Sequence, residues 1–469
     1  MRRWLAVFLS IGLVRPVSVA QASPQQAATQ APALAELLEK PYLWLFENAA
    51  ELNLPAATLQ EHRRKLEREK RQEQQQLEQQ RRRLEQEIER AQQALHQLNR
   101  QSTDAESEKR RHDLHCHIQE LRRQVGDLEL ALRQGVDVKY DNLFAKLRLL
   151  QEWPTAQRQL LSRIQSGQAS ARKFGDFRDI GFRNGTFQNQ ADDIARGREA
   201  IEELRRNGIL PPEVEDESVV RYVRTLAQRL AQNSDLQVPL QVTVLKSEEI
   251  NAFALPGGFL FVNTGLILKA ETESELAGVL AHEIAHVAAR HGHRLMKRAT
   301  IASLIYQAAQ VAALVLTGGV ASIGTAYALQ YGFYGLGLFL SLELLGVSRD
   351  YEIEADILGT QYLWKAGYNT RGFINFFDRM TLEKGYATGL SWFRTHPPFY
   401  ERMAVTYSEI LYLPHPEQAA DDTSEFQRIK GQLAQILLEM EKKDRDAPTL
   451  QKVYECRDRE DHSHALRHP

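Results

Sequence analysis

The sequence contains very few cysteines. Among its 469 residues there are two, Cys116 and Cys456, which lie far apart along the chain. Two cysteines allow at most one bridge, which excludes the disulfide framework that is typical of small exported domains. An exported chain could pair these two, but we interpret them as incidental.

The chain also lacks a surplus of charge of either sign. It has 59 Lys and Arg residues against 61 Asp and Glu residues, and its formal net charge is -2. A nucleic-acid binder needs a basic excess to neutralise phosphates, so this balance argues against that class of protein. The length predicts two or three structural units, and the apolar share of 43% is sufficient for at least one core.

The N-terminus has the three parts of a secretory signal. Met1-Arg2-Arg3 precedes an apolar run from Trp4 to Val14, and small residues around Ala20 and Ala22 follow. The run is shorter than the roughly 20 residues that span a bilayer. We therefore expect residues 1–22 to be a cleaved signal and the chain to be exported, with a short retained anchor as the alternative.

The next part of the chain is predicted to be helical. Residues 23–55 are expected to be a linker with a short helix, and residues 56–135 a dense field of charged residues and glutamines with leucines at coiled-coil spacing. One antiparallel register pairs every apolar position from Leu84 with Leu128 to Leu98 with Leu114. We predict a coiled-coil helical hairpin that could bind a protein partner; an intermolecular coiled coil is the alternative.

The remaining segments are assigned from local signals. Residues 136–170 are expected to be a connecting helix broken at Pro154, residues 171–415 a globular domain, and residues 416–469 a helical and polar tail. Alternation predicts strands over 238–244 and 259–262, with a turn at 256–258 before the second strand.

A five-residue motif carries the main chemistry. Thr272, with Glu275 three residues later, predicts a capped helix that contains His282-Glu283-Ile284-Ala285-His286. The two imidazoles lie one helical turn apart on the same face, where both can reach one metal ion. Glu283 lies beside them, where its carboxylate can take a proton from a water that the metal activates.

A catalytic zinc site needs a third protein ligand and an open position. The metzincin pattern requires a glycine at Ala289 and a histidine at Gly292, so it does not apply. We interpret His291 and His293 as a pair of helix-end histidines.

The third ligand is expected on a second helix, which is predicted to begin at Ser348 and to end over Trp364-Lys365-Ala366-Gly367. Glu352 and Asp356 share one face of it, where Glu352 would bind the metal and Asp356 would accept the ring N–H of a zinc histidine. Ala355 and Gly359 are small enough to let the two helices approach closely. Glu354 points elsewhere and is expected to be an ordinary surface carboxylate.

With these residues the sequence resembles the gluzincin metallopeptidase family that includes the CAAX prenyl proteases, the heat-shock protease HtpX and the periplasmic β-barrel assembly-enhancing protease. The resemblance covers roughly residues 174–412. The matching motifs are Asn251-Ala252-Phe253-Ala254-Leu255-Pro256-Gly257-Gly258, the His282 motif with Arg290-His291-Gly292, Ser348-Arg349 before Glu352 and Asp356, and Thr395-His396-Pro397-Pro398 with Arg402.

The resemblance implies one zinc per chain, held by His282, His286 and Glu352, with Glu283 as general base. It further implies that His396 approaches the zinc or assists catalysis, although a plain structural histidine in a turn is the alternative. It also implies that the strand region aligns an extended peptide substrate. The substrate-binding residues would be Asn251, Ala252, Phe253, Ala254, Gly257 and Gly258.

The resemblance and the signal together predict a periplasmic metalloendopeptidase. Its substrates would be unfolded or misassembled envelope proteins, as part of protein quality control. The expected fold is α+β, a mostly helical zincin domain with a small sheet after the helical hairpin. The alternative is a chaperone-like or scaffolding envelope protein whose zinc site is silent or gated.

One segment bears on membrane association. Residues 299–342 contain no Asp, Glu, Lys or Arg, and they are long enough for membrane-spanning helices. Glycines at 318 and 319 and scattered polar residues weaken the case for a span. We expect an apolar insert beside the active site, and association with a membrane through this segment is the alternative. A multispanning enzyme that cuts prenylated substrates is disfavoured.

Overall fold

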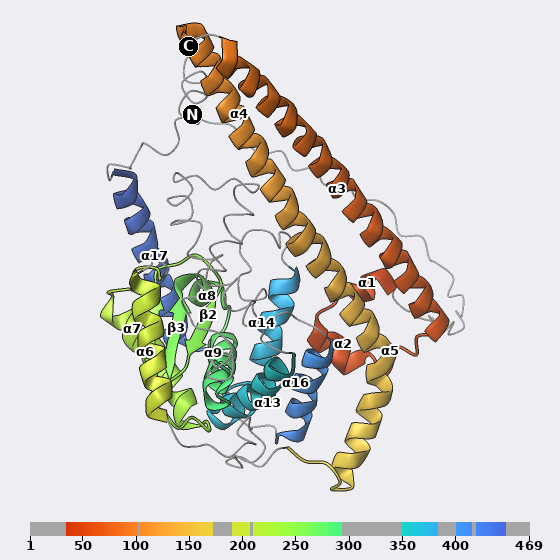
Figure 1. Ribbon diagram of the computed structural model, residues 1–469. Coiled ribbons are helices and arrows are strands. Elements are labelled where there is room, and N and C mark those ends of the chain that lie inside the picture. Colours follow the sequence, from red (N-terminus) through yellow and green to blue (C-terminus); the bar gives the residue numbers. More distant parts are fainter. Residues whose placement is uncertain are drawn as a thin grey trace, which may run out of the picture.

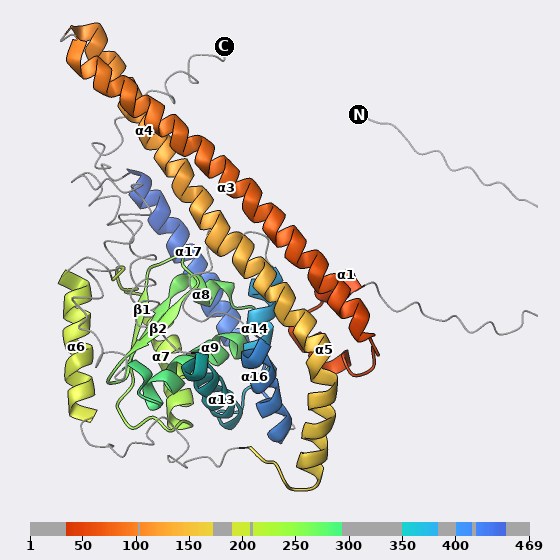
Figure 2. The same ribbon diagram turned by 45° about the vertical axis from the view of Figure 1, so that its right-hand side comes forward.

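The computed structural model describes residues 34–101, 104–171, 190–206, 210–292, 349–382, 400–414 and 419–446. Within them, helices surround one small sheet, and a pair of long helices extends beyond the rest (Figures 1 and 2). The predicted α+β class, mostly helical with a small sheet, is confirmed. The predicted signal, the uncharged segment 299–342 and His396 lie outside the described residues.

The sheet has three strands in the order β1-β3-β2. The central strand β3 (Phe259–Asn263) runs parallel to β1 (Gln241–Leu245) and antiparallel to β2 (Ala252–Leu255), and all its residues are buried. β1 begins later than the alternation predicted. Pro239 lies within the predicted strand, and a proline cannot donate to a ladder.

A tight turn joins β2 to β3. Gly257 and Gly258 have φ angles of 85° and 90°, which favour glycine. A Cβ on Gly257 would also lie 2.5 Å from the Cα of Ile194, so the turn packs directly against helix α6. The turn predicted at 256–258 is confirmed, and it leaves β2 at the edge of the sheet.

Eight helices in the described residues lie in the part of the chain from residue 190 onward. They are α6 (Gln190–Arg206), α7 (Glu217–Gln232), α8 (Thr264–Lys269), α9 (Glu273–Ala288), α13 (Arg349–Lys365), α14 (Arg371–Leu382), α16 (Tyr400–Tyr412) and α17 (Ser424–Asp446). Helix α9 lies at their centre, where it contacts α7, α13, α14 and β2. It is buried almost all round, as expected of a core helix.

The ends of the two central helices follow the predicted signals. The Thr272 side chain accepts a hydrogen bond from the Glu275 amide at 3.3 Å and caps α9. At the end of α13, Gly367 has a φ of 83° and the Tyr368 amide donates to the Leu363 carbonyl at 3.1 Å. This is the Schellman arrangement, so the predicted stop at Gly367 is confirmed.

The N-terminal part forms an arm that begins with two short helices, α1 (Leu34–Leu38) and α2 (Tyr42–Asn48). The long helices α3 (Ala56–Gln101) and α4 (Ala105–Leu130) then lie side by side in opposite directions (Figures 1 and 2). A π-helical turn, η1 (Ala131–Val136), continues α4 into α5 (Asp137–Gln165). No helix in the described part of the chain combines the length and apolarity needed to cross a membrane.

The structure has Cys116, on α4, in a disulfide, so the interpretation of this cysteine as incidental is wrong. The other cysteine of the chain, Cys456, lies outside the described residues.

The predicted break at Pro154 is wrong, because α5 runs through this proline to Gln165. A proline inside a helix costs about 3 kcal/mol, so tertiary packing must outweigh that cost. The preceding residue, Trp153, is 2% exposed and donates from its ring nitrogen to the Phe46 carbonyl at 3.0 Å. Its ring also meets those of Phe46 and Tyr407 edge-on, which ties α5 to α2 and α16.

Candidate metal centre

Helices α9 and α13 cross at a glycine. A Cβ on Gly359 would lie 3.0 Å from both the amide nitrogen and the Cα of His282, so the backbones approach as closely as a glycine allows. Ala355, one turn earlier on α13, is fully buried. This close approach, expected from the small residues, is what brings side chains of α13 up to the His282 motif.

Three side chains converge at the crossing. The Nε2 atoms of His282 and His286 lie 3.5 and 3.3 Å from the two carboxylate oxygens of Glu352, and 2.9 Å from each other. One ligand atom from each residue lies within 4.8 Å of the others. Ligands of a tetrahedral zinc at about 2.1 Å would be about 3.4 Å apart, so the spacing suits one such ion.

The carboxylate of Asp356 lies behind His282. Its Oδ1 is 2.8 Å from the His282 Nδ1, and both side chains are fully buried. With Nδ1 facing this carboxylate, the lone pair of Nε2 is directed at the convergence point. The distance matches the position proposed for Asp356 from the sequence.

Arg402, on α16, completes this group. Its guanidinium binds both oxygens of Asp356 at 2.5 and 2.9 Å and one oxygen of Glu352 at 3.0 Å, and it is fully buried. The carboxylates outweigh burial and raise the pKa of Arg402. In the sequence, Arg402 stands out only as part of a matching motif, because no local pattern shows that α16 lies against α13.

The two motif histidines have opposite pKa shifts. Burial acts to lower the pKa of His282, but hydrogen bonds to Asp356 and Glu352 outweigh it and raise that pKa to about 9. Burial dominates at His286 and lowers its pKa well below the ordinary value. Glu352 is a hydrogen-bond partner of both rings and acts to raise both pKa values.

The prediction that Glu354 is an ordinary surface carboxylate is wrong. Its Oε2 lies 3.0 Å from the Nε2 of His291, and the Nδ1 of His291 lies 2.9 Å from the Nδ1 of His286. His291 is 1% exposed. Arg290 has a φ of 55°, a left-handed conformation that turns the chain at the end of α9 and places His291 beside His286.

Glu283 lies on α9 between the two histidines and is 2% exposed. Its negative charge contributes to the raised pKa of Arg402. The carboxylate therefore belongs to the same buried group of charges as Glu352 and Asp356. A carboxylate in this buried group is suited to accept and return a proton.

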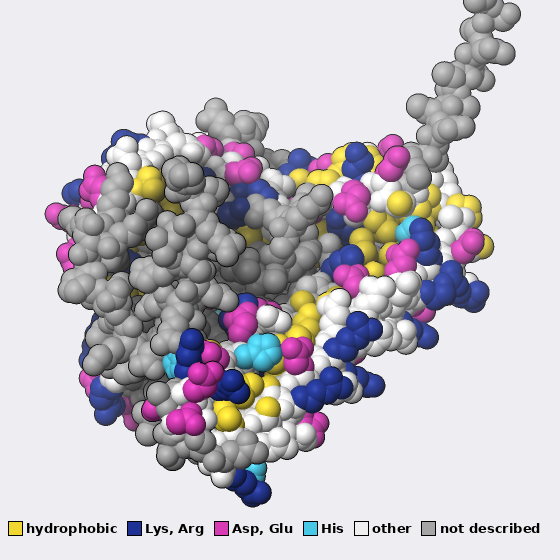
Figure 3. Space-filling model, turned by 90° about the horizontal axis from the view of Figure 1, so that it is seen from above, with side chains coloured by type: hydrophobic (Ala, Val, Ile, Leu, Met, Phe, Trp, Pro, Cys, Tyr) yellow, Lys and Arg dark blue, Asp and Glu magenta, His cyan; other side chains and the backbone are white. Residues whose placement is uncertain are grey.

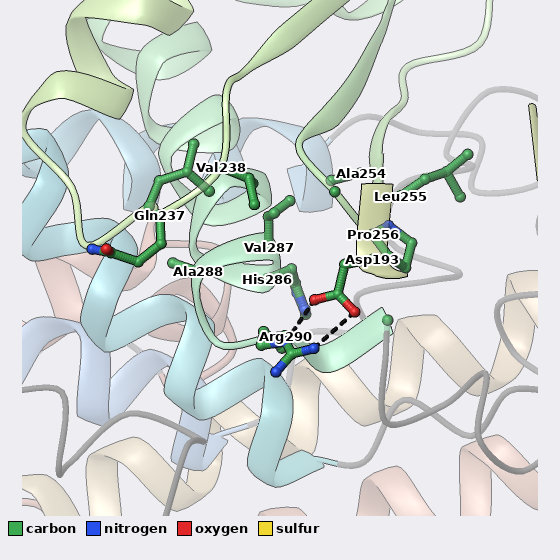
Figure 4. Close-up of a pocket in the computed structure, with 13 residues that line it drawn as sticks. Asp193, Gln237, Val238, Ala254, Leu255, Pro256, His286, Val287, Ala288 and Arg290 are labelled. Carbon is green, nitrogen blue, oxygen red and sulfur yellow. Dashed lines mark hydrogen bonds and ion pairs between the residues drawn. The ribbon is translucent and has the colours of Figure 1, made fainter. Parts of the chain in front are cut away.

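A small pocket opens between the end of β2 and the end of α9 (Figure 4). Asp193 of α6 and Arg290 form a double ion pair across it at 2.6 and 2.8 Å, beside His286. Its lining is Asp193, Leu236, Gln237, Val238, Ala254, Leu255, Pro256, Gly257, His286, Val287, Ala288, Arg290 and Gly292. The pocket is mostly apolar and reaches one of the motif histidines.

The proposed substrate-binding residues occupy different positions. Ala254 and Gly257 line this pocket, whereas the Ala252 and Phe253 side chains are buried, the latter stacked on Phe261. Asn251 is buried just before β2, and its carbonyl accepts from the Asn263 amide at 3.0 Å. Gly258 lies in the turn, where a Cβ would meet the Pro239 carbonyl at 2.3 Å.

The donor set fits a bound metal. Two imidazoles and one carboxylate with an open position form a typical catalytic zinc site. Three buried carboxylates, Glu283, Glu352 and Asp356, share this space with the guanidinium of Arg402. A divalent cation would offset the negative charge that these carboxylates bring into the interior.

Comparison with known proteins agrees with this geometry. Residues 217–409 match the family model described as Peptidase family M48. The chain is 27% identical over 247 residues to the beta-barrel assembly-enhancing protease of Yersinia pestis, covering 52% of this chain and 49% of that one. It is 34% identical over 164 residues to metalloprotease YcaL of Escherichia coli, covering 35% and 59%.

A further match is to the mitochondrial metalloendopeptidase OMA1 of Schizosaccharomyces pombe, at 29% identity over 185 residues and covering 39% of this chain and 50% of that one. The chain thus spans about half the length of the relatives that it matches. The matched range includes α9, α13 and the start of α16, which carry every side chain of the convergence point. The resemblance to the gluzincin metallopeptidases is confirmed, and residues 217–409 of this chain form a domain of peptidase family M48.

Proposed function

We propose that this chain is a zinc-dependent metalloendopeptidase that hydrolyses internal peptide bonds. The observation that carries the proposal is the convergence of His282, His286 and Glu352 at one buried point of a family M48 domain. These three residues would hold one zinc ion per chain. When bound, the ion supplies Lewis-acid chemistry, which polarises a carbonyl and makes water more acidic.

The protein's own residues supply the remaining steps. Glu283 takes a proton from the attacking water and later delivers it to the leaving amine. Asp356 keeps His282 oriented through the Nδ1 contact, and Arg402 holds Asp356 in place. His396, outside the described residues, is proposed to assist at the developing negative charge of the substrate.

The substrate is proposed to bind as an extended strand. β2 lies at the edge of the sheet, and an edge strand offers backbone groups for pairing with a peptide. The pocket at its end is lined by apolar side chains and reaches His286. A small apolar side chain of the substrate would suit it, whereas backbone pairing at β2 accepts many sequences.

The test uses the purified chain and a Glu283→Gln variant. Both should bind one zinc ion per chain, while the variant should cleave an unfolded protein at least about 100-fold more slowly, because the proton acceptor is lost. A Glu89→Gln change on the exposed face of α3 is the matched control and should leave cleavage unchanged. A native chain without zinc, or equal cleavage by both proteins, would refute the proposal.

We also propose an envelope location and substrate class. The predicted signal at 1–22 favours export to the periplasm, and one similar protein is named a beta-barrel assembly-enhancing protease. Unfolded or misassembled envelope proteins are therefore the proposed substrates. Peripheral contact with a membrane would involve the uncharged segment 299–342.

The arm is proposed to be an antiparallel coiled-coil hairpin that binds a protein partner. Ala91 and Leu121, one of the predicted pairs, are both buried, and Arg81 and Glu129 lie 3.4 Å apart between α3 and α4. Lys and Arg side chains are interspersed with Asp and Glu side chains on the face drawn in Figure 3. Such mixed charge suits a polar protein partner better than a nucleic acid.

A further inference from the structure

The two motif histidines have different supports at their Nδ1 atoms. The Nδ1 of His282 faces the Asp356 carboxylate at 2.8 Å. The Nδ1 of His286 instead lies 2.9 Å from another ring nitrogen, the Nδ1 of His291. Two ring nitrogens at this distance share one proton, so one of them must donate and the other accept.

Glu354 decides the direction of that hydrogen bond. Its carboxylate lies 3.0 Å from the Nε2 of His291 and can only accept. His291 therefore carries its proton on Nε2, which leaves Nδ1 as an acceptor in the neutral ring. The Nδ1 of His286 must then donate, and the lone pair of His286 is on Nε2, the atom that lies 3.3 Å from Glu352.

His291 is held in place from two sides. Its ring stacks on Tyr351 of α13 at a centroid distance of 4.4 Å and an interplanar angle of 11°. The preceding residue, Arg290, is fixed by its double ion pair with Asp193 of α6 (Figure 4). The α6 helix precedes the matched family range, so a segment outside that range helps to position the ring.

We propose that His291 and Glu354 are positioning residues, which set the ring orientation and tautomer of His286 so that its Nε2 is available to a metal. The inference rests on the proposed function, because it takes His286 as a ligand. If the hydrogen-bonded relay from Glu354 through His291 to His286 positions the ligand, it contributes to zinc affinity itself, beyond any effect on peptide cleavage.

The test measures zinc affinity by competition with a chelating dye. His291→Phe keeps an aromatic ring against Tyr351 but removes both nitrogens, and Glu354→Ala removes the acceptor. Each should weaken zinc binding by about 10- to 100-fold. Glu354→Gln, whose amide oxygen can still accept, should stay within about threefold of the native chain. His96→Phe on the exposed face of α3 is the matched control.

Three further measurements separate positioning from folding. Thermal unfolding of the metal-free proteins should be similar for the native chain and Glu354→Ala, and cobalt(II) in place of zinc should give an altered visible spectrum in the variants. The double variant should bind zinc no more weakly than His291→Phe alone, because both changes break one relay. If His291→Phe does not fold, the comparison of zinc binding by Glu354→Ala and Glu354→Gln alone decides whether the relay exists.

The outcomes distinguish the two proposals. Native zinc affinity in both His291→Phe and Glu354→Ala, in a chain that binds zinc and cleaves protein, would overturn the relay and leave the proposed function standing. A native chain that binds no zinc would overturn the proposed function.

Discussion

At the scale of single residues, Arg402 is the main support of the candidate site. Its guanidinium binds Asp356 through two nitrogens and Glu352 through the third, in the fully buried interior. Removing one partner of a buried ion pair leaves an uncompensated charge and costs about 3–5 kcal/mol. Arg402 and a bound metal both stabilise the same carboxylates. Without Arg402, the stability of the folded protein should therefore depend more strongly on the metal.

We therefore expect Arg402→Met to lower the free energy of unfolding of the metal-free protein by about 3–5 kcal/mol. Added zinc should stabilise this variant by more than it stabilises the native chain. Urea unfolding with a chelator and with zinc measures both effects. Arg428→Met is the control, because Arg428 is 59% exposed and its ion pair with Glu425 is 4.0 Å long. Loss of such an exposed pair should lower the free energy of unfolding by about 1 kcal/mol or less. Equal losses in the two variants would contradict the expectation.

At the scale of elements, the contact of α9 with α13 depends on Gly359. A Cβ there would lie 3.0 Å from the His282 backbone, and the helices would have to separate by a few tenths of an ångström. Overpacking of this kind costs about 1–3 kcal/mol. The separation would also move Glu352 away from His282, because these residues lie on the two helices that meet at this glycine.

Gly359→Ala should therefore weaken zinc binding and should not raise stability. The matched control is Gly431→Ala on α17, where an added Cβ meets nothing within 4 Å. That change should stabilise the protein by about 0.5–1 kcal/mol through helix propensity. Thermal unfolding and zinc competition compare the two variants. A gain at Gly359 as large as the gain at Gly431 would show that the helices tolerate the extra methyl.

The elements also show what could be predicted from the sequence. Capping and glycine signals predicted the start of α9 and the end of α13, and the spacing of the motif placed His282 and His286 one turn apart on α9. These signals lie within a few residues of the feature that they predict. The pairing of Glu354 with His291 and of Arg402 with Asp356 depends on how distant helices pack, which local periodicity does not encode. The same holds for Pro154, where tertiary packing outweighs the local signal.

At the scale of the whole molecule, the arm is joined to the peptidase domain through α1 and α2. The buried Lys146 of α5 donates to the carbonyls of Leu38 and Lys40 at 2.9 and 2.7 Å. Asp378 of α14 accepts from the amides of Tyr42 and Leu43 at the start of α2. The segment from α1 to the start of α2 thus makes polar contacts with α5 of the arm and with α14 of the domain. These contacts hold this end of the arm against the domain.

Asp378 should make this junction sensitive to pH. Burial raises its pKa to about 6, although the two amides favour the ionised form. The folded protein therefore binds more protons than the unfolded chain between about pH 4 and pH 6. The contribution of Asp378 to stability is therefore most favourable below pH 4 and is lost as the pH rises through 6. A pKa difference of this size corresponds to roughly 3 kcal/mol.

Urea unfolding of the native chain and Asp378→Asn at several values between pH 4 and pH 7 measures this contribution. An asparagine keeps an acceptor for one amide but does not ionise. The difference in stability between the two proteins should shift toward the variant by up to about 3 kcal/mol as the pH rises. A difference that stays constant over this range would contradict the assignment, because an ionisable group at this junction would then have the same pKa in the folded and unfolded chains.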